Sequence, residues 1–287
     1  MSKKRVNVII PVKNGEKFIP RCINSILNQT RKPERIIVVD DKSQDRSLEI
    51  LLDYGRKYPQ LITVIQGDDK GVSPARQKAL NSATGDYIAF LDVDDFYHEK
   101  TIENQLKHIE KTGAVCGRMI QLLPDGTYFE KEYPENDFRI TYSMLKMKNS
   151  IVMSSVMIKK SILDLVGGFD EKLLRIEDYD LHLRVSRYTD YYFSKDIIVY
   201  YQTYEEKGHL EKAFIYSKWT GVVWRKHGFI NLSELLRVAK YAILNIMLVP
   251  INIVIRVLFR KNRPIFRSQY LKFLYSYISG FLKGYKT

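Results

Sequence analysis

Short apolar runs alternate with longer amphipathic segments along the first 95 residues of the chain. The runs at residues 6–12, 35–40, 61–65 and 86–91 are rich in Val and Ile and hold few polar positions. Runs of this kind are typical of strands that are buried on both faces of a sheet. We therefore expect four buried strands in this part of the chain.

The segments between these runs have the length and the start signals of helices. Residues 18–28 carry an apolar stripe, residues 47–58 follow a capping signal at Ser43, and residues 73–85 have Pro74 in their first turn. Strands that alternate with such helices form right-handed βαβ units and a mainly parallel sheet with helices on both faces. Ligands bind these sheets beyond the carboxyl ends of the strands.

The pattern loosens after Asp95 and predicts a mixed α/β second half. We expect helices near 99–111 and 177–188, strands near 114–121, 152–158 and 197–201, and a hairpin at Pro124-Asp125-Gly126. Residues 1–210 are therefore interpreted as one Rossmann-like α/β domain, and residues 211–287 as a helical C-terminal extension.

The composition is that of a globular protein in a reducing compartment. The 287 residues are 45% hydrophobic and 28% charged, which excludes disordered and low-complexity classes. Cys22 and Cys116 are the only cysteines, so a multi-bridge disulfide framework and a C-x-x-C metal or redox site are excluded. The early apolar run at Val8–Val12 is too short for a signal peptide, and we expect the chain to start in the cytoplasm.

Positive charge is concentrated at the C-terminal end of the chain. The net charge is +13, and the residues from Leu232 onward hold ten Lys or Arg against the single acid Glu234. This tail is also rich in apolar and aromatic residues, whereas a nucleic-acid reader needs a basic face on its folded domain. We therefore expect an anionic membrane surface, and no nucleic acid, as the partner of the tail.

Residues 241–259 form an apolar segment that is long enough to span a bilayer. Helical geometry gathers the polar positions in and around this segment on one narrow stripe. The stripe contains Arg237, Asn245, Asn252, Arg256, Arg260 and Arg263. We expect such a helix to lie in the membrane interface, because placing Arg256 mid-span would cost about 2.5–3.5 kcal/mol. A membrane span and packing against a protein surface are the alternatives.

Three acidic clusters occur where the predicted sheet would place its ligands. Asp40-Asp41 ends the second strand, Asp92-Val93-Asp94-Asp95 ends the fourth strand, and Glu177-Asp178 opens a late helix. Two carboxylates separated by one residue present hard oxygen ligands, which suit Mg²⁺ or Mn²⁺ bound to a diphosphate. Asp is also a common helix-capping residue, so one cluster would be weak evidence, and the three together favour a site.

Two other protein classes also place aspartates at strand ends. A receiver domain is far shorter than this chain, and a haloacid dehalogenase phosphatase needs its nucleophile on the first strand, where this chain has Pro11-Val12-Lys13. The sequence also lacks the His-Glu-x-x-His, Gly-x-Ser-x-Gly and Walker patterns. Neither of the two classes fits the sequence well.

Four segments of the chain occur in an order and spacing that characterise one enzyme family. They are VNVIIPVKNGEKFIPRCINSILNQT, IIVVDDKSQD, GVSPARQKALNSATGDYIAFLDVDD and GGFDEKLLRIEDYDLHLRV. Together they resemble the family 2 glycosyltransferases with the GT-A fold, and the resemblance covers about residues 5–202. Each segment alone is moderate evidence, and the four in order are highly specific.

The resemblance implies a nucleotide-binding role for residues of the first three segments. Pro11 and Lys13 match the first-strand residues that line the nucleotide, and Asp41 matches the aspartate that hydrogen-bonds the base. Arg76 matches a position near the diphosphate. Many members carry an aromatic residue where Lys13 stands, which leaves both the base and the phosphate open as the partner of Lys13.

The resemblance also implies the metal ligands and the catalytic residues. Asp92 and Asp94 match the Asp-x-Asp motif, in which Asp94 would bind a Mn²⁺ or Mg²⁺ ion directly and Asp92 would lie nearer the ribose. Asp178 matches the catalytic base and follows Glu177 in the Glu-Asp pair of the family. A single displacement at the anomeric carbon, with the proton taken by a carboxylate, inverts the configuration.

The family implies an inverting, divalent-metal-dependent glycosyltransferase that uses a nucleoside-diphosphate sugar, with UDP as the expected nucleotide. From the basic tail we also expect a membrane-associated glycan or lipid-linked acceptor. We expect the protein to be peripheral on the cytoplasmic face of the cell membrane. A catalytically silent sugar-nucleotide-binding or scaffold subunit is the alternative, although all the expected acids are present. The sugar, the acceptor and its linkage, and the oligomeric state, a homo-oligomer included, stay open.

Overall fold

The computed structural model describes residues 4–130, 132–204 and 209–229. The chain divides into two compact units, residues 1–205 and residues 206–287, and each is described by itself. In the second unit the described residues form helix α8 (His209–Lys226) and the turn that follows it. Among the helices that the structure describes, none is both long and apolar enough to cross a bilayer. The helix expected at 241–259 and the rest of the basic tail lie outside the described residues.

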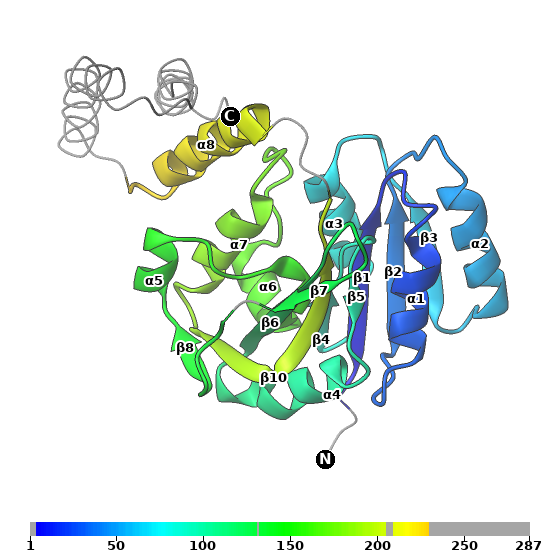
Figure 1. Cartoon of the computed structure of the whole chain (residues 1–287), viewed down its shortest axis with the longest axis horizontal. Coiled ribbons are helices and arrows are strands. Elements are labelled where there is room, and N and C mark those ends of the chain that lie inside the picture. The colour runs from blue at the N-terminus through cyan, green and yellow to red at the C-terminus, as the bar shows by residue number, and fades with distance from the viewer. Residues whose placement is uncertain (1–3, 131, 205–208, 230–287) are drawn as a thin grey trace, which may run out of the picture. The chain divides into compact units, whose positions relative to one another are not determined.

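One sheet of ten strands runs through the first unit (Figure 1). The strands are β1 (Val6–Val12), β2 (Arg35–Asp40), β3 (Ile62–Gln66), β4 (Tyr87–Phe90), β5 (Phe96–Tyr97), β6 (Ala114–Leu122), β7 (Tyr128–Glu130), β8 (Phe138–Ile140), β9 (Met157–Lys159) and β10 (Tyr191–Gln202). Their order is β3-β2-β1-β4-β9-β6-β10-β5, with β7 beside β6 and β8 beside β10. The strands β1 to β4 pair in parallel, and among the other strand pairs of the described residues only β6 with β10 is parallel.

Helices of the first unit cover both faces of this sheet. They are α1 (Ile19–Leu27), α2 (Ser47–Lys57), α3 (Val72–Asn81), α4 (Thr101–His108), α5 (Tyr142–Met147), α6 (Lys160–Val166) and α7 (Glu177–Val185). Successive residues of a strand point to opposite faces. Val8 and Ile10 of β1 therefore pack in one core cluster with Cys22 of α1. Ile9, which is also fully buried, points to the other face, where α3 contacts β1 and β2.

The first half of the chain folds as its apolar pattern predicts. The four predicted strands correspond to β1, β2, β3 and β4 within one residue at each end. The three predicted helices appear as α1, α2 and α3, of which α3 ends at Asn81, earlier than expected. The expectation of a parallel sheet is confirmed for this half, and the sheet becomes mixed beyond β4.

The second half departs from the prediction in the region of residues 152–158. This region is expected as one strand, but Met153–Ser155 form a 3₁₀ turn and only the end of the region continues into β9. The Ser154 hydroxyl donates to Asp95 Oδ2 at 2.5 Å, and the Ser155 hydroxyl donates to the carbonyl of Val152 at 2.8 Å. The Ser155 bond is local, and bonds of this kind compete with the hydrogen bonds of a strand ladder. The Ser154 bond instead joins the turn to the loop after β4.

The order of the strands reverses at β1, which pairs with β2 on one side and with β4 on the other. All three strands are parallel, so their carboxyl ends lie at the same edge of the sheet. The chain first moves outward from β1 to β3 and then returns to β4. A reversal of this type separates the loops and opens a crevice at that edge, where open α/β sheets bind their ligands.

Candidate functional site

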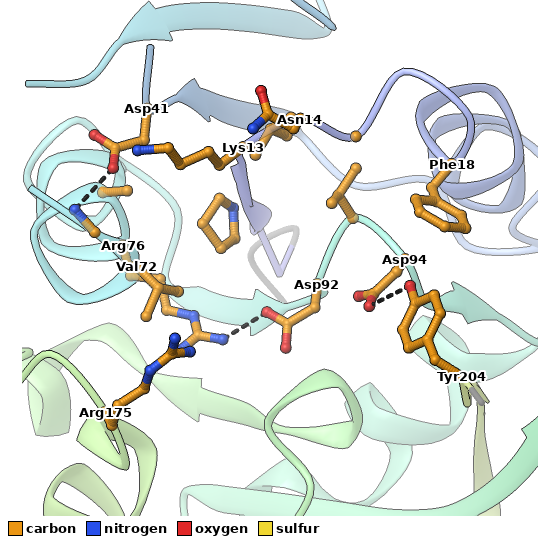
Figure 2. A pocket seen from close by; sticks show the side chains of 16 residues that line it. Lys13, Asn14, Phe18, Asp41, Val72, Arg76, Asp92, Asp94, Arg175 and Tyr204 are labelled. Carbon is orange, nitrogen blue, oxygen red and sulfur yellow. Dashed lines mark hydrogen bonds and ion pairs between the residues drawn. The ribbon is translucent and has the colours of Figure 1, made fainter. Parts of the chain in front are cut away.

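A pocket of about 480 Å³ opens at the carboxyl ends of β1, β2 and β4 (Figure 2). The loops after these strands form most of it, together with α3 and two residues from later in the chain, Arg175 and Tyr204. Six of the residues expected from the sequence line this pocket. They are Pro11, Lys13, Asp41, Arg76, Asp92 and Asp94.

Asp41 directly follows β2 and holds the loop that precedes α3. Its carboxylate accepts hydrogen bonds from the backbone N–H groups of Asp69 and Gly71, each at 2.8 Å. Gly67 permits this approach, because a Cβ atom at that position would lie 2.6 Å from Asp41 Oδ1. Lys13 forms an ion pair with Asp69, which joins the loop after β1 to the loop after β3. One side of the pocket is therefore fixed by bonds within the protein.

Arg76 of α3 is a buried cation that lies between two acids from distant parts of the chain. Its Nη2 donates to Asp92 Oδ1 at 2.5 Å, and its Nη1 forms an ion pair with Glu177. Only 4% of the Arg76 side chain and 8% of the Glu177 side chain are exposed, so water screens these charges weakly. The bridge joins the end of β4 to the start of α7. Removing one partner of a buried pair typically costs about 3–5 kcal/mol.

Glu177 and Asp178 lie in the first turn of α7, directly after a strained residue. Ile176 has φ +51° and ψ +28°, a left-handed conformation that β-branched residues rarely adopt. Asp178 accepts a hydrogen bond from Asn149 Nδ2 at 3.4 Å. Burial, followed by the negative charge of Glu177, raises the pKa of Asp178 to about 6. Asp178 is not one of the pocket-lining residues, and the ion pair of Glu177 with Arg76 connects its helix to the pocket.

Three acids crowd the loop after β4. Asp94 Oδ2 accepts a hydrogen bond from the Tyr204 hydroxyl at 2.8 Å, and Figure 2 shows this pair on the side of the pocket opposite Asp41. Burial, followed by the charge of Asp92, raises the pKa of Asp94. Burial, followed by the charges of Asp92 and Asp94, raises the pKa of Asp95 well above its ordinary value. A bound cation would relieve this repulsion.

Asp92 and Asp94 could bind a divalent cation that takes its other ligands from substrate phosphates. Each carboxylate uses one oxygen for a protein donor, and the second oxygen has no side-chain partner among the described residues. The described part of the chain contains no group of three or more His, Cys, Asp or Glu that could enclose a cation alone. Mg²⁺ usually binds through one or two carboxylates plus substrate phosphates. This donor set therefore suits Mg²⁺ or Mn²⁺ held together with a diphosphate.

Sequence reasoning did not single out several residues of the pocket wall, among them the large side chains of Phe18, Arg175 and Tyr204. Arg175 makes no ion pair with any residue that the structure describes, in contrast to the two other cations of the wall, Lys13 and Arg76. A basic residue shortly before the Glu-Asp pair is a signal that could have identified Arg175. Tyr204 lies 110 positions from its partner Asp94, and no local pattern marks it.

A comparison with protein families matches the first part of the chain to a known group. The model described as glycosyl transferase family 2 matches residues 7–164, a span that includes Asp41, Asp92 and Asp94. An uncharacterized glycosyltransferase of Rickettsia typhi is 30% identical over 204 residues, which are 68% of this chain and 62% of that protein. The chain thus spans less than two thirds of the length of this curated relative.

Two solved structures have a similar fold. S. aureus TarS 1–349 in complex with UDP-GlcNAc has a TM-score of 0.61 at 20% identity, over 76% of this chain and 66% of that chain. Mannosyltransferase PcManGT from Pyrobaculum calidifontis, in complex with GDP-Man and Mn²⁺, has a TM-score of 0.61 at 16% identity, over 96% and 70%. At these identities the likeness shows the fold alone, and it confirms the α/β architecture expected from the sequence.

The neighbouring acids Glu177 and Asp178 should have opposite effects on stability. A pKa raised from 3.8 to about 6 means that the folded chain binds the Asp178 proton more tightly than the unfolded chain does, so stability falls as pH rises through this window. Asp178→Asn removes the buried charge. We expect this variant to be about 1–2 kcal/mol more stable than wild type near pH 8, with the difference vanishing near pH 4.

Glu177→Gln is the matched variant, because it removes a charge from the adjacent position but breaks the pair with Arg76. It should lose about 2–4 kcal/mol near pH 8. Guanidinium unfolding at both pH values measures these differences. A destabilised Asp178→Asn protein near pH 8 would show that the Asp178 charge is well compensated in the fold.

Proposed function

This chain belongs to glycosyl transferase family 2 and has the GT-A fold, and on that premise we propose that it transfers a sugar from a nucleoside diphosphate to a hydroxyl group. The observation that carries the proposal is the pocket at the ends of β1, β2 and β4, which is lined by Asp41, Asp92 and Asp94 and by two arginines. Structures with this fold hold UDP-GlcNAc or GDP-Man. A sugar nucleotide offers the base, ribose and diphosphate that such side chains bind.

We place the nucleotide base at Asp41, beside the wall formed by Pro11 and Lys13. An ionised carboxylate offers about four acceptor sites, so Asp41 keeps acceptor capacity after its bonds to the backbone of Asp69, Lys70 and Gly71. The imide N–H of uracil would find an acceptor there. UDP is accordingly the first nucleotide to test, with Asp92 toward its ribose.

Asp94, together with Asp92, would hold a Mn²⁺ or Mg²⁺ ion against the donor diphosphate. When bound, such an ion acts as a Lewis acid that neutralises charge on the leaving group. Arg175 adds a guanidinium that has no acidic partner in the described part of the chain. Guanidinium groups bind phosphate oxygens through two parallel hydrogen bonds. We therefore assign Arg175 to the diphosphate as well.

Asp178 is the proposed catalytic base. Its carboxylate takes the proton of the acceptor hydroxyl as the hydroxyl oxygen bonds to the anomeric carbon and the bond from that carbon to the diphosphate oxygen breaks. A pKa of about 6 suits a base that is ionised at neutral pH and still attracts a proton. Glu177 forms an ion pair with Arg76, so we assign it the role of positioning Arg76. Attack opposite the leaving group inverts the anomeric configuration.

Asp178→Asn and Asp94→Asn should separate catalysis from donor binding. A donor is first identified by thermal shift with a panel of UDP-, dTDP- and GDP-sugars and Mn²⁺, because a bound ligand raises stability. Asp178→Asn should then lower the transfer rate by about 10²- to 10⁴-fold, the usual contribution of a general base, while Mn²⁺-dependent nucleotide binding is kept. Asp94→Asn should lose the Mn²⁺ dependence of binding.

Donor hydrolysis in the absence of an acceptor serves as the assay until the acceptor is known. A wild-type chain that binds the donor and releases no diphosphate would support a silent binding subunit instead. Undiminished turnover by Asp178→Asn would end the assignment of the base.

Arg175→Ala tests the assignment of Arg175 to the diphosphate. We expect it to weaken UDP binding by about tenfold or more, because hydrogen bonds to charged groups contribute about 1.5–3 kcal/mol. UMP binding should change much less, since UMP lacks the second phosphate. Arg35, which is exposed at the amino end of β2, offers the control Arg35→Ala. Calorimetric titration of both nucleotides gives the two ratios, and equal losses for UDP and UMP would refute the assignment.

We further propose that residues 1–210 form the catalytic domain and that residues 211–287 bring it to a membrane. The basis is the sequence of the tail, which joins ten Lys or Arg to an apolar segment at 241–259. An amphipathic basic helix binds anionic lipid by apolar burial and by charge. The acceptor is then a glycan or a lipid-linked intermediate at the cytoplasmic face of the membrane, where the enzyme is peripheral.

Deleting residues 232–287 should abolish sedimentation with anionic vesicles, and the full chain should bind zwitterionic vesicles more weakly than anionic ones. Full-length chain with Arg256→Gln and Arg260→Gln is the milder variant. Each basic residue near an anionic surface contributes about 1 kcal/mol, so this double variant should bind anionic vesicles roughly tenfold or more weakly. Unchanged binding by the truncated chain would refute the anchor.

A further inference from the structure

Tyr204 lies two residues after the end of β10 and lines the pocket next to the loop that follows β4. Its hydroxyl donates to Asp94 Oδ2 at 2.8 Å. Its ring packs edge-to-face on Phe18, with 6.0 Å between the ring centroids and an interplanar angle of 79°. Figure 2 shows Phe18, Tyr204 and Asp94 together on one side of the pocket. Tyr204 is thus held at both its ring and its hydroxyl.

The backbone that carries Tyr204 is anchored by the same acidic loop. The backbone N–H of Gln202 donates to Asp95 Oδ1 at 3.0 Å, and the N–H of Thr203 donates to the carbonyl of Leu122 at 2.9 Å. Asp95 therefore holds the end of β10, and this strand end places the Tyr204 hydroxyl beside Asp94. The position of Tyr204 is therefore set by backbone hydrogen bonds of the sheet as well as by the contacts of its own side chain.

Arg21 holds the same region from a third direction. Its Nη2 donates at 2.9 Å both to the backbone carbonyl of Asp94 and to Gln202 Oε1. The backbone of Asp94 is thereby held by Arg21, and its carboxylate is held by Tyr204. With Oδ2 engaged, the rotation of the carboxylate is restricted and Oδ1 is left without a side-chain partner in the described part of the chain.

We propose that Tyr204 is a positioning residue for Asp94, which it orients so that Oδ1 presents to the divalent cation of the donor complex. This inference rests on the proposed function, because it presumes that Asp94 binds the cation. A ligating carboxylate commonly accepts a second hydrogen bond from the protein, and this bond sets its direction. The alternative is that the phenol competes with the cation for Asp94. The two readings predict opposite changes in cation affinity when the hydroxyl is removed.

Tyr204→Phe removes this one hydroxyl and keeps the ring that packs on Phe18. We expect the Kd for Mn²⁺, measured from the EPR signal of free Mn²⁺ in the presence of UDP, to rise about 10- to 100-fold, as is typical when the partner of a metal ligand is lost. Tyr204→His, which offers an N–H donor, should recover part of the affinity. Transfer by Tyr204→Phe should return toward the wild-type rate at saturating Mn²⁺, because Asp94 itself is unchanged.

Tyr128→Phe is the matched control, since Tyr128 lies on β7, is 59% exposed and is not part of the pocket wall. It should bind Mn²⁺ as wild type does. Equal or tighter Mn²⁺ binding by Tyr204→Phe overturns the inference, and tighter binding identifies competition. A wild-type chain that binds UDP with no Mn²⁺ dependence would instead remove the proposed cation site, and this inference with it. The wild-type titration therefore separates failure of the proposed function from failure of the role of Tyr204.

Discussion

A buried guanidinium needs compensating charge where it lies, and this requirement ties the candidate site together. Only 4% of the Arg76 side chain is exposed, so without partners its charge would carry a large desolvation cost. Asp92 from the end of β4 and Glu177 from the start of α7 supply the compensation. Two segments that are far apart in the sequence are thereby brought to one point. This contact links the helix that carries the proposed base, Asp178, to the loop that carries the proposed leaving-group site.

The acids of the pocket are oriented by the protein itself. Asp41 accepts hydrogen bonds from backbone amides, Asp92 pairs with Arg76, and Asp94 accepts from Tyr204. Groups that are already oriented need little reorganisation when charge develops in a transition state. Two features of the pocket lack complete compensation: burial and the charges of Asp92 and Asp94 raise the pKa of Asp95, and Arg175 lacks an acidic partner among the described residues. A cation bound to a diphosphate complements both features.

Much of the fold and part of the site could be predicted from the sequence, and the division has a physical basis. Apolar runs in the sequence indicate burial directly, so β1 to β4 and the helices between them could be predicted. The acids that follow β2 and β4 could be predicted for the same reason, because they directly follow these runs. The turn at Met153–Ser155 could not be predicted, because it depends on a local bond from Ser155 to Val152 and on a distant bond from Ser154 to Asp95. Tyr204 could not be predicted for another reason. Its hydroxyl bonds Asp94, which is 110 positions away in the sequence, and the order of strands in the sheet brings the two residues together.

The left-handed backbone at Ile176 bears on how such a chain can change. A β-branched residue in that conformation stores strain of the order of 1–3 kcal/mol, and it stands immediately before the two carboxylates of α7. Glycine or asparagine would relax the backbone there at once. Selection for stability alone would therefore favour these substitutions, whereas a strained active site is a feature that selection for activity can retain. In directed evolution of this chain, selection for stability and selection for activity would therefore favour different residues at position 176.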